Sequence, residues 1–130
     1  MNTSIKSDTA VTAVSNPEYI LQSVLTALSN GKISEAVDQF RDDFTFNDHA
    51  LELEFTDKGR LSEFFQKSRE LFPDTAVEVL STFESGDHVI AEWKLTATQS
   101  YFVPPLRAPF AAPGVTIARI ENGKIKYWTD

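Results

Sequence analysis

The sequence predicts one α+β domain, with helices concentrated in the first part of the chain and a run of strands after Thr75. Apolar residues recur at helical spacing in three segments, and every later segment alternates with period two. The chain has 130 residues, enough for one hydrophobic core without disulfides or a metal. We expect residues 16–130 to form the domain and residues 1–15, which are mostly small and polar, to form a flexible tail.

The helix starts are marked by capping residues. Asn16 precedes Pro17, a proline suited to the first helical position, and Thr56 or Asp57 can cap the third helix, which Pro73 must end. The expected helices are residues 17–30, 33–40 and 57–72. Each carries one apolar stripe, so each is expected to bury one face against the rest of the domain.

The strands follow from alternation and from turn residues. "DDFTFND" and "LELEF" are short strands before the third helix, and "TAVEVLSTFE", "HVIAEWKLTATQSYF", "VTIARIE" and "KIKYWTD" follow it, with "SGD" and "NG" as turns. The segment "VPPLRAPFAAPG", residues 103–114, is rich in proline, which prevents strand pairing. It is either a stiff connector or an apolar lid over the mouth of a cavity.

Alternation also sorts the strand residues into faces. On the long strand the inward face, which forms the core or a cavity, is Ala91, Trp93, Leu95, Ala97, Gln99 and Tyr101. On two other strands Asp48 follows Phe46, and Asp130 follows Trp128, on the same face. A carboxylate against apolar walls has a raised pKa and can serve as a general acid or base near neutral pH. The alternative for both acids is a solvated strand end.

Composition excludes several classes of function. The absence of cysteine removes disulfides, thiolate nucleophiles and cysteine-based metal sites, and the formal net charge of -7 argues against a nucleic-acid partner. His49 and His88 lack the spacing of a metal site, and no motif for a cofactor or a serine nucleophile is present. No apolar run is long enough for a signal peptide or a membrane span, so we expect a cytoplasmic protein with no membrane partner.

Two segments carry a resemblance to a known superfamily. "LTALSNGKISEAVDQFRDDFTFND" and the final "ENGKIKYWTD" resemble the nuclear transport factor 2-like superfamily over residues 17–130. This resemblance implies a cone, in which a curved antiparallel sheet packs on three N-terminal helices and encloses a pocket. The residues expected to line the core and pocket are Phe46, Phe64, Phe65, Trp93, Leu95, Tyr101, Ala118, Ile120 and Trp128.

Within this superfamily, "AEWKLTATQ", a proline-rich segment and "GVTIARIENGKIKYWTD" are similar to the SnoaL-like polyketide cyclases. That resemblance makes Asp130 the acid-base residue and puts Gln99, a hydrogen-bond donor to a carbonyl, where those enzymes hold a histidine. Similarity to the ketosteroid isomerases puts Asp48 at their general base. Their oxyanion donors fall on Val24 and Thr116, which are not comparable donors.

Two hypotheses for function follow. The first is a cofactor-independent isomerase, cyclase or lyase, in which Asp48 or Asp130 acts on a hydrophobic carbonyl compound. The residues expected to bind the substrate are Phe46, Trp93, Gln99, Tyr101 and Trp128. The second is a non-catalytic module that binds a ligand or a partner. We expect Asp130 to be required, and Asp48 to have the raised pKa, because Asp130 shares its surroundings with a terminal carboxylate if the chain ends there.

We also expect a homodimer, because apolar residues alternate onto the outer face of the sheet. They are Ile90, Val115, Ile117, Ile125 and Tyr127. The alternative is a monomer, since Glu92, Lys94 and Arg119 share that face.

Overall fold

The computed structural model of the protein describes residues 16–101 and 106–130, with only the backbone described for residues 99–101 and 106–108. In chain order its elements are α2 (Pro17–Ser29), α3 (Ile33–Asp38), β1 (Phe40–Asp48), β2 (Leu53–Phe55), α4 (Lys58–Leu71), β3 (Ala76–Ser85), β4 (His88–Tyr101), β5 (Leu106–Glu121) and β6 (Lys124–Thr129). The expected tail, residues 1–15, lies outside the described residues. The α+β class is confirmed.

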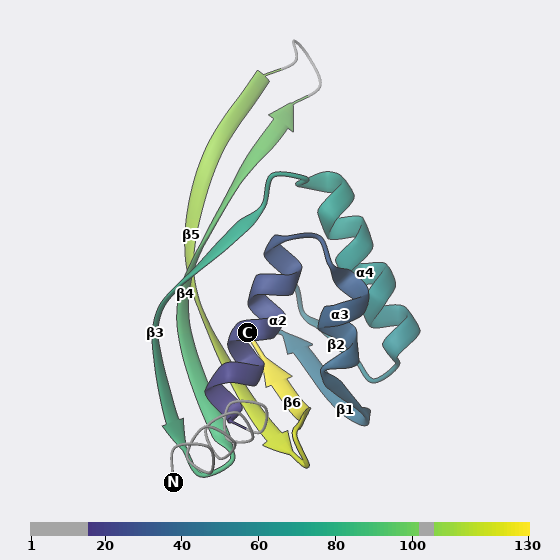
Figure 1. Cartoon of the computed structure of the whole chain (residues 1–130). Helices are drawn as coiled ribbons and strands as arrows, with labels where there is room; N and C mark the ends of the chain where they lie inside the picture. Colours follow the sequence, from purple (N-terminus) through teal and green to yellow (C-terminus); the bar gives the residue numbers. More distant parts are fainter. Residues whose placement is uncertain (1–15, 102–105) are drawn as a thin grey trace, which may run out of the picture.

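The strands form one curved sheet of six strands in the order β2-β1-β6-β5-β4-β3. In Figure 1 the long strands β3, β4 and β5 bend along one side of the molecule, and the helices lie inside the bend. Helix α2 packs on these three strands, α3 packs on α2, and α4 packs on α3. None of the described helices has the length and apolar character that a membrane crossing requires.

The sheet is mixed, whereas an entirely antiparallel sheet was expected. All neighbouring strands are antiparallel except β1 and β6, which run parallel. A parallel pair needs a long crossover connection, and the whole chain between β1 and β6 supplies it. Alternation within a strand reports its faces and not its direction, so the sequence pattern could not reveal this pairing.

The predicted helix starts are confirmed. The Asn16 side chain accepts a hydrogen bond from the Tyr19 N–H at 3.2 Å, and the Asp57 side chain accepts one from the Arg60 N–H at 2.9 Å. Each bond satisfies an N–H group that has no partner within the first turn of its helix. Helices α2 and α4 therefore begin directly after these two capping residues, as the sequence predicts.

The proline-rich segment is a strand over much of its length, which corrects the expectation that proline would prevent pairing. Pro109 pairs with Thr98 and Pro113 with Lys94, although residues 102–105 lie outside the described residues. Over this stretch β5 is the edge of the sheet, because β6 pairs with β5 only from Ile117 onward. A proline N atom that faces an open edge removes no ladder hydrogen bond, so both prolines are tolerated there.

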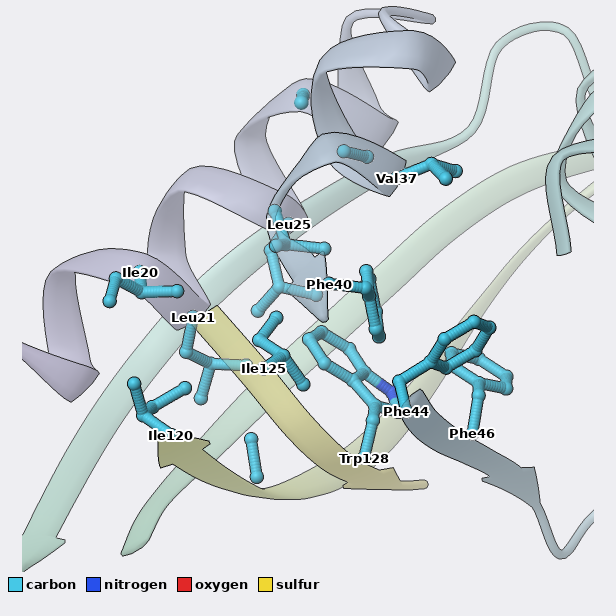
Figure 2. Packing of buried hydrophobic residues seen from close by; sticks show 14 of the residues in the cluster. Ile20, Leu21, Leu25, Val37, Phe40, Phe44, Phe46, Ile120, Ile125 and Trp128 are labelled. Atoms are coloured by element: carbon cyan, nitrogen blue, oxygen red, sulfur yellow. The ribbon is translucent and has the colours of Figure 1, made fainter. Parts of the chain in front are cut away.

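An aromatic cluster fills the core between β1, β6 and the helices (Figure 2). Trp128 is 1% exposed and stacks on Phe46, with ring centroids 5.9 Å apart. Phe40 lies 5.7 Å from the Trp128 ring and 5.3 Å from the Phe44 ring. Such ring contacts add to the free energy gained from burying the rings, so this cluster joins the first and last strands.

Ile125 was expected on the outer face, and this expectation is wrong. A bulge at Lys126 adds one residue to β6, because Arg119 pairs with Tyr127 while Ile120 pairs with Ile125. The extra residue reverses the face on which the following side chains lie. Ile125 is therefore fully buried, whereas Tyr127 is exposed on the outer face as expected.

Gly114 provides space for the Trp93 ring. A Cβ atom at residue 114 would lie 2.1 Å from Trp93 Cη2, a distance that two carbon atoms cannot adopt. The indole of Trp93, a residue of β4, therefore lies across the backbone of β5, the strand that pairs with β4. Any side chain at residue 114 must move this ring.

We predict that Gly114→Ala lowers the free energy of unfolding by about 1–3 kcal/mol, the usual cost of overpacking, and changes the tryptophan near-ultraviolet circular dichroism. Urea unfolding and the spectrum measure the two effects. Gly86→Ala is the control for the spectrum alone, because no atom lies within 4 Å of its added Cβ, whereas its φ of +62° makes any side chain there costly for stability. An unchanged spectrum and stability in Gly114→Ala would contradict this packing.

Candidate active site

The two acids singled out in the sequence lie on neighbouring strands. Phe46 pairs with Trp128 and Asn47 with Thr129 in the parallel ladder of β1 and β6. The ladder continues to the next residues, because the Asp130 N–H donates to the Asn47 carbonyl at 3.0 Å. Asp48 and Asp130 therefore stand side by side, and the negative charge of Asp48 acts on Asp130.

A chain of hydrogen bonds fixes the Asp130 carboxylate. The indole N–H of Trp93 donates to Thr116 Oγ1 at 2.9 Å, and Thr116 Oγ1 donates to Asp130 Oδ1 at 2.5 Å. The indole N–H of Trp128 donates to the same Oδ1 at 2.8 Å. Because an indole can only donate, the Thr116 hydroxyl must accept from Trp93 and give its own hydrogen to Asp130. A proton on neutral Asp130 therefore belongs on Oδ2.

The surroundings of Asp130 favour its neutral form. Burial raises the pKa of Asp130 to about 6, although the hydrogen bonds from Thr116 and Trp128 lower it, and the charge of Asp48 adds to the rise. The sequence argument favoured Asp48 for the raised pKa, whereas the structure assigns it to Asp130. The physical reason is burial: Asp130 contacts the Trp128 indole and the fully buried Thr116, and Trp93 in turn contacts Thr116.

Asp48 has different surroundings. It is half-buried at the end of β1, and its Oδ1 accepts a hydrogen bond from the Leu51 N–H at 3.0 Å. This bond closes the turn that follows β1 and fixes the carboxylate at the strand end. Asp48 also lines a cavity of about 290 Å³. It is thus the member of the acid pair that faces this space.

The cavity lies between the helices and the inner face of the long strands. Four phenylalanine rings and several aliphatic side chains form most of its wall, as is typical of small-molecule sites. Its lining residues are Leu28, Ile33, Asp48, Leu51, Phe64, Phe65, Ser68, Arg69, Phe72, Thr75, Val77, Leu95, Ala97 and Phe110. Phe110, from the proline-rich segment, meets the Phe72 ring edge-on at 5.9 Å between centroids.

The residues expected to bind substrate are dispersed in the structure. Phe46 and Trp128 belong to the buried core. Trp93 is half-buried and donates a hydrogen bond to Thr116. These three residues therefore support the acid pair from the core side. The Gln99 and Tyr101 side chains lie outside the described residues. The expected lining residues Phe64, Phe65 and Leu95 do reach the cavity.

Sequence reasoning did not name Arg69 and named Thr116 only as a poor oxyanion donor, although both are polar residues of this region. Thr116 is fully buried and joins Trp93 to Asp130. The signal was its inward position on β5, two residues from Ala118, where a polar side chain needs a buried partner. Arg69 lines the cavity from the last turn of α4. Its signal was its place four residues after Phe65, on the apolar side of the helix.

The histidines do not contribute to this site. The His88 ring lies 2.8 Å from the Asp87 carboxylate, and its side chain is 54% exposed. His49 is also exposed. Across residues 16–101 and 106–130, no three histidine, cysteine or acidic side chains are grouped so that they could hold a metal ion.

Solved structures with the same fold support this description. A protein with a ketosteroid isomerase-like fold from Catenulispora acidiphila, in complex with trimethylamine, is 22% identical, with a TM-score of 0.76 over 85% of this chain and 82% of that one. A candidate polyketide cyclase from Streptomyces antibioticus is 18% identical, with a TM-score of 0.77 over 88% and 89%. Another, from Acidithiobacillus ferrooxidans, is 23% identical, with a TM-score of 0.73 over 87% and 84%.

The comparison with curated proteins found no match. The sequence profile of the SnoaL-like domain matches residues 21–128, which is most of the chain and reaches from within α2 to within β6. The fold, with its curved sheet around three helices, agrees with the nuclear transport factor 2-like fold of the solved structures. The chain therefore belongs to the SnoaL-like domain family.

Proposed function

We propose that this protein is a cyclase- or isomerase-type enzyme that transfers protons on a small hydrophobic carbonyl compound bound in the cavity beside Asp48. The observation that carries the proposal is the pair of adjacent aspartates at an apolar cavity, one with a pKa raised to about 6. Carboxylates in unlike environments can act as acid and base at the same pH. The family match and the shared fold agree with such an activity.

The two aspartates take different roles in this proposal. Asp48 faces the cavity, so its carboxylate removes a proton from the carbon next to the ligand carbonyl. Asp130 stands beside Asp48 but is not among the described residues that line the cavity. The proposal therefore requires the ligand oxygen that gains negative charge to reach past Asp48, where Oδ2 of Asp130 supplies the proton. Return of the proton from Asp48 to another carbon completes an isomerisation, as the enol proton goes back to Asp130. In a cyclisation the enol carbon adds to a second carbonyl of the same molecule, the new alkoxide takes the proton from Asp48, and the enol proton returns to Asp130. Neither reaction needs a cofactor.

Burial favours the protonated state of Asp130, and the supporting groups fix which of its oxygens carries the proton. Trp93 donates a hydrogen bond to Thr116, and Thr116 donates one to Asp130. Trp128 donates to Asp130 directly. These donors hold Oδ1, which leaves Oδ2 as the oxygen that carries the exchangeable proton. Gln99 and Tyr101 stay predicted as donors to the ligand carbonyl.

We predict that the protein accelerates deuterium uptake at the acidic carbon of 2-tetralone, a simple hydrophobic ketone, measured by proton NMR in deuterium oxide. Loss of the base in Asp48→Asn should lower the protein-dependent rate by about 10²–10⁴-fold. In the wild type the rate should fall as pH rises through about 6, because Asp130 loses its proton. Asp130→Asn should be slower and lack this fall.

Asp42→Asn is the matched control, because Asp42 lies on β1 with Asp48 but its side chain is fully exposed. This variant should retain the wild-type rate and pH profile. Equal rates in the wild type and in Asp48→Asn would remove the catalytic proposal.

The second candidate is a non-catalytic protein that binds a hydrophobic ligand in the same cavity. The observation in its favour is that the described wall of the cavity is mostly apolar, with few polar groups to stabilise an enolate oxygen. Binding of 2-tetralone without any deuterium uptake would favour this candidate over the enzyme.

We further propose that two copies associate through the outer face of the sheet. Phe83 pairs with Ile90, and Ile90 with Ile117, which places three large apolar side chains in one row across β3, β4 and β5. Their exposed fractions are 63%, 38% and 38%. Val115, two residues before Ile117 on β5, adds a fourth apolar side chain next to this row, with an exposed fraction of 47%. A row of this kind is typical of an interaction surface.

Sedimentation velocity tests the association. The wild type should sediment as a dimer at micromolar concentration, and Ile90→Lys, which puts a charge into the row, should sediment as a monomer. Thr96→Lys, exposed on the same strand but away from the row, should remain a dimer. A monomeric wild type would contradict the association.

A further inference from the structure

Arg69 is a half-buried cation in the wall of the cavity. Its Nη1 donates to the Ser29 carbonyl at 2.9 Å and to the Thr75 carbonyl at 3.3 Å. These bonds fix the guanidinium between the end of α2 and the start of β3. Gly31 lets the group lie close to the backbone, because a Cβ there would be 3.3 Å from Arg69 Nε. The charge is therefore held in one place beside the cavity.

The described residues give Arg69 no acidic partner. No carboxylate among them forms an ion pair with it. By contrast, Arg41 pairs with Asp43 at 2.7 Å and Arg119 pairs with Asp87 at 3.1 Å, although both pairs are largely at the surface. Two backbone carbonyls, one of them at the C-terminal end of α2, compensate the half-buried charge of Arg69 in part, but no described carboxylate neutralises it.

Arg69 keeps donors that the fold does not use. A guanidinium has five N–H groups in a fixed fork, and the two carbonyls take those of Nη1. The N–H groups of Nε and Nη2 make no hydrogen bond to any described residue. Together Nε and Nη2 form the edge that can bind both oxygens of a carboxylate at once.

The rest of the cavity limits the kind of ligand that Arg69 can bind. Its neighbours Phe65 and Phe72 are apolar, so the body of the ligand must be apolar as well. One guanidinium balances one negative charge. A phosphate, with a charge of about -1.5 to -2 at neutral pH, would leave an excess beside the carboxylate of Asp48. A carboxylate is the matching anion.

We propose that Arg69 anchors a carboxylate of the ligand, so that the cavity takes a hydrophobic carbonyl compound that also carries a carboxylic acid group. The inference rests on the proposed function, because it assumes that the cavity binds a small molecule. Arg69 holds one end of the ligand, the phenylalanine rings enclose its body, and Asp48 meets the carbon that reacts.

Binding of 2-naphthoate and 2-naphthamide, measured by calorimetry near neutral pH, tests the anchor. The two compounds share an apolar body and differ in the charge of the end group. The wild type should bind 2-naphthoate about tenfold more tightly than 2-naphthamide, the effect expected of a charge-assisted pair of hydrogen bonds. Arg69→Gln should bring the ratio of the two dissociation constants to about one.

Arg60→Gln is the matched control, because Arg60 lies on the same helix, is exposed and does not line the cavity. It should retain the wild-type ratio. The ratio separates an anchor from a structural role, because a variant that only loosens the fold weakens both compounds alike. Thermal unfolding of both variants checks that each is folded.

Each other outcome overturns the anchor in a different way. Equal affinity of the wild type for both compounds would remove Arg69 as an anchor and leave the proposed pocket function intact. An unchanged ratio in Arg69→Gln would assign Arg69 a structural role only. If neither compound binds, the pocket itself fails, and with it the anchor.

Discussion

Parallel pairing of β6 with β1 brings the last strand of the chain beside the first. The pairing aligns Phe46 with Trp128, which stacks the two rings in the core. The same ladder carries the backbone on to residue 130, where the Asp130 N–H bonds to β1. Core and site therefore depend on one strand pairing, and a slip of that register would separate the two acids and the two rings together.

The aromatic residues on this ladder, together with Trp93 on β4, have two effects. Their rings bury the apolar surface that stabilises the domain, and the indole N–H groups of Trp93 and Trp128 supply the hydrogen bonds that hold Thr116 and Asp130. A carboxylate removed from water is costly when it is charged. The cost is avoided below about pH 6, because Asp130 retains its proton there. At higher pH the hydrogen bonds to Oδ1 lower the cost.

The structure also shows why the cavity lies where it does. Helix α4 ends beside β3, and its last turn presents Arg69 and Ser68 next to the phenylalanine rings. On the opposite side, β5 brings Phe110 to the wall at a stretch where the strand is a sheet edge. The proline-rich segment thus forms part of the cavity as a strand, with proline tolerated only because that edge is open.

Sequence reasoning predicted the fold in most of its parts, and it failed where the relevant signal is three-dimensional. Caps such as Asn16 and Asp57 act within a few residues, so they could be read directly. The bulge that buries Ile125 and the parallel direction of β6 depend on partner strands, which alternation does not report.

The candidate site, too, could be predicted from the sequence only in part. Asp48 and Asp130 could be found because each follows an aromatic residue on an inward face. The raised pKa of Asp130 could not, since it comes from burial by residues of other strands, Thr116 on β5 among them. Arg69 was hidden for a related reason, because only the folded chain shows that no described acid pairs with it.

Direct titration of Asp130 tests the central claim, that burial keeps this carboxyl group protonated close to neutral pH against the opposing hydrogen bonds from Thr116 and Trp128. Carbon-13 NMR of its side-chain carboxyl group would follow the ionisation. The wild type should show an inflection at about pH 6, and Thr116→Val, which removes a donor to the charged form, should move it higher. An inflection near the ordinary aspartate value of about 3.9 in both proteins would contradict the account.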